Sequence, residues 1–333
     1  MDGNAPDRPW RVGFLLIDGF ALMSYAAARE PLRVANLLAG QELYRVRDVT
    51  LTDAPTRASA GMIVHSDALM GDAFDYDLVL VVAGGDPFSV AIDRLAPWLR
   101  GLDRRGALLG GVSGGPVLLA RAGLMENRRL TLHWEHERTL AETHPDLVLE
   151  RSLFVIDRDR LSCAGGTAPL DLMHALIAQQ HGSLFARRVS DWLIHTEVRR
   201  SGGAQRAGAA ERYGVSHPGL LAVVEAMEAA LSRTQTLMQW ARHAGVGERQ
   251  LDRLFRQHLQ ATPLAFHRNL RLDKAAALLA TTSLSVSEIA LATGFSNFSH
   301  FGTTFARRFG TSPVAFRDGK RRSSGGGPRN DRM

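Results

Sequence analysis

Cysteine is almost absent from this 333-residue sequence, in which Cys163 is the only one. An internal disulfide is therefore excluded, which suits a cytoplasmic protein. The sequence also lacks any apolar run near the roughly 20 residues needed to cross a bilayer. Its N-terminus has no basic segment followed by an apolar core of the secretory type. We expect a cytoplasmic protein with no membrane contact, no metal ion and no cofactor.

Acidic residues are scarce from residue 215 onward. Residues 215–333 hold sixteen Lys and Arg against eight Asp and Glu, whereas residues 1–214 hold twenty-four against twenty-six. The length allows two domains, each with its own core. A basic C-terminal domain beside a near-neutral N-terminal one favours contact of the former with a polyanion. A solvated basic surface has the same composition, so charge alone leaves both interpretations open.

Up to residue 199 the sequence alternates short apolar runs with segments of helical periodicity. The run at 78–83 is rich in valine and is closed by two glycines, and the run at 107–112 is closed by Ser113. Apolar strands that alternate with helices predict an α/β sandwich around a mostly parallel sheet. Further strands are expected at 11–17, 44–52, 153–156 and 160–163, and helices at 21–38, 116–122, 170–180 and 183–199.

A Gly-x-Ser-x-Gly pattern spans residues 111–115, between an expected strand and an expected helix. It matches the nucleophile elbow of α/β-hydrolases, which would need a histidine and an acid. His133, His174 and Asp171 are the nearest downstream candidates. A tight strand-to-helix turn also selects glycine for steric reasons and serine as an N-cap, without catalysis. We favour a structural or ligand-binding role for Ser113 over a hydrolase or amidase, and predict no catalytic residue.

The same elbow defines a candidate ligand pocket, because parallel sheets collect ligands at the carboxyl ends of their strands. The Ser113 hydroxyl and the first N–H groups of the next helix suit a carboxylate. Trp134 could attract a cationic nitrogen and Glu30 could pair with it. Each also has a structural interpretation, with Trp134 in the core, Glu30 in solvent and His133 as a hydrogen-bonded polar residue. The predicted ligand-binding residues are Ser113, Gly114, His133, Trp134, Glu30 and Gly85.

Two helix–turn–helix patterns follow one another at residues 236–256 and 286–308. In each, a short helix ends at a glycine, Gly245 or Gly294, and a second helix carries polar side chains on one face. Such a unit lays its second helix in a DNA groove. The second helices are expected at 248–260 and 298–309, with a long helix at 264–280 between the units and shorter helices at 219–231, 235–244 and 286–293.

Residues 107–134 resemble the elbow region of the PfpI-type superfamily, relatives of class I glutamine amidotransferase domains. The resemblance rests on the elbow and on the segments Ala122-Gly123-Leu124 and Thr131-Leu132-His133-Trp134. Enzymatic members carry a nucleophilic cysteine where this sequence has Ser113, and Cys163 lies outside the elbow. The resemblance therefore implies a catalytically inactive domain, in which Cys163 is a small buried apolar residue.

Nearly the whole chain, from about residue 11 to 317, resembles one group of regulators. Segments 30–36 and 163–173 are similar to the sensor domains of GlxA-type transcription regulators, and residues 220–316 resemble the AraC/XylS DNA-binding domain. The resemblance implies a flavodoxin-like PfpI domain fused to an all-α domain with two helix–turn–helix units. It also implies an effector that is a small nitrogen-containing metabolite, such as arginine, carnitine or betaine.

The resemblance carries DNA-binding roles onto both second helices. Arg249 and Arg253 suit bidentate contacts to guanine, and Asp252 suits cytosine N4 or an arginine of its own helix. Arg256 and Arg307, with Arg268 and Arg308, suit phosphates, which position the protein without specifying sequence. The predicted DNA-binding residues are Arg249, Asp252, Arg253, Arg256, Phe298, Ser299, His300, Thr303 and Arg307.

The expected domain organisation has a disordered N-terminus at 1–10, a PfpI-like sensor at 11–199, a flexible linker at 200–217, a DNA-binding domain at 218–319 and a disordered tail at 320–333. The expected partners are double-stranded operator DNA, a small-molecule effector, a second copy of the chain and RNA polymerase. We expect a ligand-controlled regulator, most simply an activator. A constitutive DNA-binding protein whose first domain only dimerises is a further alternative.

Overall fold

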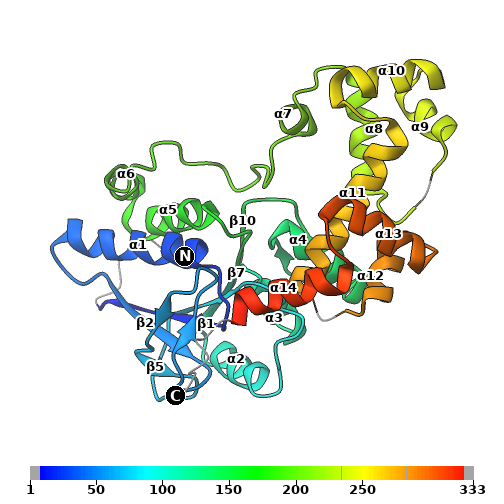
Figure 1. Ribbon diagram of the computed structural model, residues 1–333. Coiled ribbons are helices and arrows are strands. Elements are labelled where there is room, and N and C mark those ends of the chain that lie inside the picture. The colour runs from blue at the N-terminus through cyan, green and yellow to red at the C-terminus, as the bar shows by residue number, and fades with distance from the viewer. Residues whose placement is uncertain (1–7, 234, 283, 326–333) are drawn as a thin grey trace, which may run out of the picture. The chain divides into compact units, whose positions relative to one another are not determined.

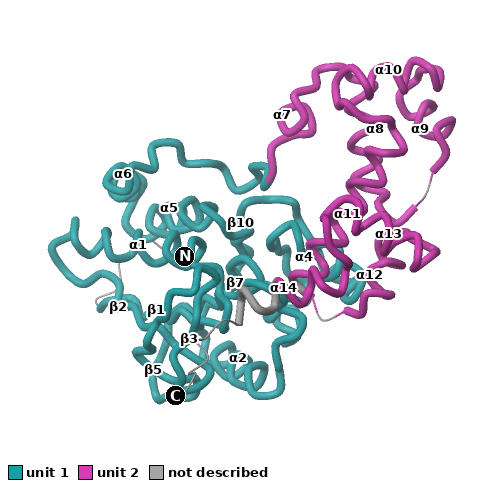
Figure 2. Tube along the Cα trace, in the orientation of Figure 1, with its two compact units in different colours: residues 1–205 teal, residues 206–333 magenta. Residues whose placement is uncertain are grey.

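The computed structural model describes residues 8–233, 235–282 and 284–325. The chain divides into two compact units, residues 1–205 (unit 1) and residues 206–333 (unit 2), which Figure 2 colours separately. The two units have separate hydrophobic cores.

Unit 1 is built on a seven-stranded sheet with the order β10-β11-β7-β6-β1-β2-β5 (Figure 1). Its strands pair in parallel except β10, which forms an antiparallel hairpin with β11. The mostly parallel α/β sheet predicted from the alternating apolar runs is confirmed. The strands of this sheet are β1 (Trp10–Leu16), β2 (Tyr44–Thr50), β5 (Ala68–Leu69), β6 (Leu78–Ala83), β7 (Leu108–Ser113), β10 (Phe154–Asp157) and β11 (Arg160–Cys163).

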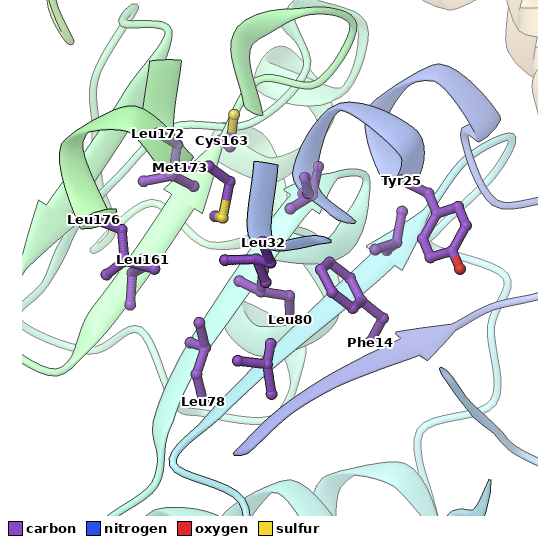
Figure 3. Close-up of a cluster of buried hydrophobic side chains, with 14 of the residues drawn as sticks. Phe14, Tyr25, Leu32, Leu78, Leu80, Leu161, Cys163, Leu172, Met173 and Leu176 are labelled. Carbon is purple, nitrogen blue, oxygen red and sulfur yellow. The ribbon is translucent and has the colours of Figure 1, made fainter. Parts of the chain in front are cut away.

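Alternate residues of the central strands point to opposite faces of the sheet, as a period of two requires. On β6, Leu80 packs into one apolar cluster and Val81 into the other. Both faces are therefore covered, which explains why the central strands are apolar throughout. Figure 3 shows the first cluster, where Phe14 and Leu80 meet side chains of α1 (Leu22–Ala39) and α5 (Ala168–His181). The remaining elements of unit 1 are α2 (Leu95–Arg104), α3 (Gly115–Arg121), α4 (Trp134–Thr143), α6 (Ser183–Trp192) and the strand pairs β3 (Thr56–Arg57) with β4 (Ile63–Val64) and β8 (Arg129–Leu130) with β9 (Val148–Leu149).

The helix expected at 183–199 is shorter than its sequence pattern indicates. Helix α6 ends at Trp192, because Ile194 adopts a left-handed backbone conformation with a φ of 59°. The amides of Ile194 and His195 close this end by donating to the carbonyls of Asp191 and Ser190. A β-branched residue in this conformation is strained and cannot continue a helix. Residues 193–205 consequently contain neither helix nor strand.

Unit 2 contains two apolar clusters, and α11 (Pro263–Thr281) contributes to both. Trp240, Leu251 and Phe255 are fully buried in the first cluster, and Phe301 and Phe305 in the second. One helix shared by two cores fixes the two helix–turn–helix units relative to each other. The other helices are α7 (Ala209–Tyr213), α8 (Pro218–Ala229), α9 (Leu237–Ala244), α10 (Glu248–Leu259), α12 (Val286–Ala292), α13 (Phe298–Phe309) and α14 (Pro313–Gly325).

Two segments expected to be irregular contain helix. Helix α7 lies within the expected linker at 200–217, and α14 continues to Gly325, inside the expected tail at 320–333. Of the expected disordered ends, residues 1–7 and 326–333 lie outside the described residues. Among the described helices, none has both the length and the apolar character that a membrane span would need.

Candidate functional sites

Ser113 occupies a sharp strand-to-helix turn between β7 and α3. Its φ of 60° is left-handed, and the residue is 7% exposed. The flanking glycines are sterically required, because a Cβ on Gly111 would lie 2.3 Å from the Pro116 nitrogen and one on Gly115 would lie 1.9 Å from the Val81 oxygen. The glycines of the pattern therefore have a packing reason that is independent of any chemistry at Ser113. The geometry is that of an elbow, as its sequence predicts.

Three polar groups from different segments meet beside the elbow. A Cβ on Gly165 would lie 3.0 Å from the Ser113 Oγ and 3.0 Å from the Ser24 Oγ, so the backbone at Gly165 passes close to both hydroxyls. The Gly166 amide donates to the Ser24 Oγ at 2.8 Å. Ser24 is 1% exposed and comes from the first turn of α1. Nothing in its local sequence distinguishes it, so the sequence gives no signal for its position.

His133 is tied to the elbow through its backbone. Its amide donates to the Ser113 carbonyl at 3.2 Å, and its Nδ1 accepts from the Glu135 amide at 3.4 Å as the N-cap of α4. Burial lowers the pKa of His133 below its usual value, against the opposing effect of Glu135. The Trp134 ring lies 5.3 Å from the His133 ring and is 39% exposed. Burial thus disfavours the protonated imidazole, which lies beside the partly exposed Trp134.

Of the other predicted pocket residues, Glu30 and Gly114 are bonded to other groups of the protein, whereas Gly85 faces open space. Glu30 forms an ion pair with Arg33 at 2.7 Å, and both side chains are more than 40% exposed. The α1 side chain found beside the elbow is thus Ser24, and the carboxylate of Glu30 already has a partner. The Gly114 amide donates to the Ala83 carbonyl at 3.1 Å and is not free to bind a ligand. Gly85 has a φ of 58° and faces open space.

The groups that a hydrolase would need are engaged elsewhere. His174 bonds the Ser190 hydroxyl at 2.8 Å, and the Asp171 carboxylate bonds His195 and Arg199. Burial raises the pKa of the Cys163 thiol to about 12. Cys163 is therefore a protonated core residue and not a thiolate nucleophile.

In the first helix–turn–helix unit, Gly245 ends α9 with a φ of 66°, and α10 begins three residues later. Helix α10 buries Leu251 and Phe255 and exposes Arg249, Arg253 and Arg256 on the opposite face. Asp252 accepts from the Arg256 Nε at 2.7 Å. This contact is the intrahelical alternative considered for Asp252, and it leaves the aspartate only partly accessible.

In the second helix–turn–helix, a buried arginine stabilises the turn between the two helices. Arg271 of α11 donates to the Thr293 carbonyl at 2.7 Å, and its guanidinium lies 4.2 Å from the centre of the Phe295 ring. Helix α13 buries Phe301, Thr304 and Phe305. The predicted readout residues Phe298, Ser299, His300 and Thr303 are exposed, as is Arg307.

The basic residues differ in how free they are to reach phosphates. Of the four predicted phosphate ligands, Arg256 and Arg308 form ion pairs at 2.7 Å with Asp252 and Asp273. The other two, Arg268 and Arg307, are therefore the more accessible. A polar cleft beside α9, which the sequence pattern does not indicate, adds further cations. It is lined by Ser232, Arg233, Gln235, Gln239, Arg242 and His243.

These two architectures define a class of protein, a transcription regulator that joins an AraC-type helix–turn–helix domain to a DJ-1/PfpI-type domain. Residues 10–179 match the DJ-1/PfpI family, and residues 240–319 match a helix-turn-helix domain family. The chain belongs to the family of HTH-type transcriptional regulators that includes GlxA, CdhR and GbdR.

The relatives cover most of the chain. It is 46% identical to GlxA of Rhizobium meliloti (strain 1021) over 92% of this chain and 95% of that protein. Identity is 44% to CdhR of Pseudomonas aeruginosa, over 90% of this chain and 89% of that protein. It is 37% to GbdR of the same species, over 94% and 85%. DNA-binding regulation is therefore the function that the family shares.

Solved structures agree with the fold of unit 1. An AraC family transcriptional regulator from Pseudomonas putida matches with a TM-score of 0.51 and 28% identity, over 56% of this chain and all of that chain (100%). A ThiJ/PfpI family protein from Pseudomonas syringae matches with a TM-score of 0.52 and 18% identity, over 71% and 89%. The second likeness concerns the fold alone.

Proposed function

We propose that this protein is a cytoplasmic, sequence-specific transcription activator controlled by a small nitrogen-containing metabolite bound at the Ser113 elbow. Unit 2 binds operator DNA as part of a homodimer and acts on RNA polymerase. Unit 1 binds the metabolite without transforming it. The observation that carries the proposal is the pairing of two exposed recognition helices, α10 and α13, fixed by a shared core helix.

The DNA-binding half of the proposal rests on which side chains are exposed. Arg249 and Arg253 project from the face of α10 opposite its buried residues, where a bidentate guanidinium can reach guanine O6 and N7. The exposed residues of α13, Ser299, His300 and Thr303, have no guanidinium that could make a bidentate contact. We therefore propose that α10 supplies most of the sequence specificity and α13 mainly orients the second contact.

Phosphate contacts come from a second set of cations. Arg268, Arg307 and the cleft residues Arg233 and Arg242 are exposed. Arg242 lies on α9, the helix that crosses the DNA backbone in this motif, and Arg233 lies shortly before it in the chain. Each phosphate contact adds affinity for any sequence and makes binding salt-dependent.

The effector half of the proposal rests on the elbow. The Ser113 and Ser24 hydroxyls are two donors that suit a carboxylate. Trp134 is 39% exposed, and its aromatic ring suits a cationic nitrogen. Burial lowers the pKa of His133 and so disfavours the charged form that would repel a cation. Glu30 is paired with Arg33. We propose that the Trp134 ring contributes attraction for the cationic end.

The test combines two measurements on the full-length protein. Duplex DNA is selected from a randomised pool, and arginine, carnitine and glycine betaine are screened by thermal shift. We expect an enriched sequence motif and at least one metabolite that raises the melting temperature and changes affinity for the selected duplex. Absence of an enriched motif would reject the DNA-binding proposal. A duplex affinity that no metabolite alters would favour the constitutive alternative.

A hydrolase or amidase is the second candidate, and one observation favours it. Ser113 holds the strained left-handed conformation that nucleophile elbows use to expose a hydroxyl. Against it, His174 and Asp171 are bonded to other groups. Turnover of amide or ester substrates that disappears in Ser113→Ala would support the enzyme. Metabolite binding without turnover would reject it.

A further inference from the structure

The last stretch of unit 1, residues 193–205, is here called the connecting segment, because unit 2 follows it directly at Arg206. It has neither helix nor strand, yet polar groups buried in unit 1 hold it at two places. An irregular segment with buried anchors differs from a flexible linker, which would have few such contacts. The first residues of the flexible linker expected at 200–217, residues 200–205, thus belong to the anchored segment.

The first anchor is the Asp171 carboxylate in the first turn of α5. Its side chain is completely buried (0% exposed). Arg199 donates to it three times, from Nε at 2.9 Å, from an Nη at 2.7 Å and from its backbone amide at 2.8 Å, and His195 Nε2 lies 2.9 Å away. The same guanidinium reaches the Thr167 hydroxyl at 3.0 Å. A buried carboxylate needs such partners, so this contact fixes the segment firmly.

The second anchor is the side-chain amide of Gln205, the final residue of unit 1. Its Nε2 lies 3.0 Å from the Thr131 hydroxyl, 3.0 Å from the Leu132 carbonyl and 2.9 Å from the Ser152 carbonyl. Between the two anchors, the Leu153 amide donates to the Ser201 carbonyl at 2.8 Å. The segment is therefore bound at its middle as well as near both ends.

Each anchor is connected to the elbow through a short stretch of chain. Leu132 precedes His133, whose amide bonds the Ser113 carbonyl. Asp171 lies on the helix that follows Gly165 and Gly166, which pass beside the Ser113 and Ser24 hydroxyls. A ligand that moves either side of the elbow by a few tenths of an ångström changes the geometry at an anchor, because packed interiors transmit small displacements.

We propose that the connecting segment couples effector occupancy at the elbow to unit 2, with Arg199 and Gln205 as its positioning residues. The inference rests on the proposed function. The elbow is either occupied by effector or empty. In one of these two states the contacts of both anchors are formed, and in the other state the contacts of one anchor are weakened. The freedom of unit 2 to engage two successive operator sites then differs between the states. Because coupling is reciprocal, DNA binding to unit 2 must also change the elbow.

That reciprocity allows a test with DNA as the only probe. Amide hydrogen exchange of full-length protein is measured with and without the duplex selected by the wild-type protein. The peptides to follow cover residues 131–134 and 164–168. We expect the duplex to change their exchange by roughly fivefold or more, the lower end of ordinary allosteric coupling. The variants are Arg199→Gln and Gln205→Ala. The control is Arg200→Gln, an exposed neighbour for which the described part of the structure records no side-chain hydrogen bond.

In Arg199→Gln and Gln205→Ala, the change at the elbow peptides disappears while affinity for the selected duplex is retained. Arg200→Gln behaves like the wild type. A change that persists in both anchor variants overturns the coupling, as does a wild-type protein that binds the duplex with no change at the elbow. If Arg199→Gln fails to fold, Gln205→Ala decides. A selection that enriches no duplex rejects the proposed function itself, which separates the two failures.

Discussion

Replacing Arg253 by alanine separates base reading from phosphate binding. Arg253 is exposed on the face of α10 opposite Leu251 and Phe255, so its removal leaves the core of the unit intact. A bidentate contact to guanine contributes about 1–3 kcal/mol of discrimination. At 25 °C this corresponds to a loss of roughly 5- to 150-fold in affinity for the selected duplex.

Arg256 supplies the matched comparison on the same helix. Its guanidinium is already paired with Asp252 at 2.7 Å, and a contact to DNA must compete with that exposed pair, which is worth about 0.3–0.5 kcal/mol. We expect Arg256→Ala to lower affinity by less than about 1 kcal/mol and equally for all sequences.

The assay is competition binding of the full-length protein to the selected duplex, to its single-base variants and to random DNA, at several salt concentrations. Arg253→Ala should lose affinity for the selected duplex and discriminate less at one base pair, with an unchanged affinity for random DNA. Equal losses on selected and random duplexes would refute base reading by Arg253 and assign it to a phosphate.

Three further predictions concern stability and the pocket. Gly115→Ala should lower the stability of unit 1 by at least about 2 kcal/mol, because its Cβ would lie 1.9 Å from the Val81 oxygen, whereas Gly202→Ala meets open space and should be neutral in thermal unfolding. Trp134→Ala should abolish the thermal stabilisation by the effector, and a shift equal to that of the wild type would remove Trp134 from the pocket. Burial and the nearby Arg271 lower the pKa of His267 to about 4, so unit 2 should lose stability as the pH falls from about 6.5, the usual value in the unfolded chain, towards 4. His267→Gln should flatten that dependence in thermal scans, and an unaltered pH profile would exclude His267 as its cause.

The parts of the fold with a strong local pattern could be predicted from the sequence. Strand β6 is a run of buried aliphatic residues closed by glycines, and its expected bounds match those found. Helix α13 also has its expected bounds, and α10 ends one residue earlier than expected. In these helices the apolar period and the turn glycine coincide with the real packing, which is why local reasoning succeeds.

Elements with weak periodicity could not be predicted. Helix α2 contains Pro97 and Gly101, which mask its helical pattern. Helix α4 buries only Leu140, so it has no apolar stripe to recognise. At 183–199 the error runs the other way, since an amphipathic pattern continues past the point where Ile194 turns the chain.

The site required information that the local sequence does not carry. The elbow is visible in the sequence as a glycine pattern. Ser24 precedes it by roughly ninety residues, and only the folding of the chain brings the two together. The bonds of Arg199 to Asp171 and of Gln205 to Thr131 likewise join residues 28 and 74 positions apart. Such contacts depend on strand order, which periodicity leaves undetermined.

The most direct test of the account is the dissociation constant of the full-length protein for its selected duplex, measured with and without saturating arginine, carnitine or glycine betaine. The account predicts that at least one of these compounds, bound at the elbow, changes the constant by roughly fivefold or more. A compound that binds unit 1 and leaves the constant unchanged would contradict it.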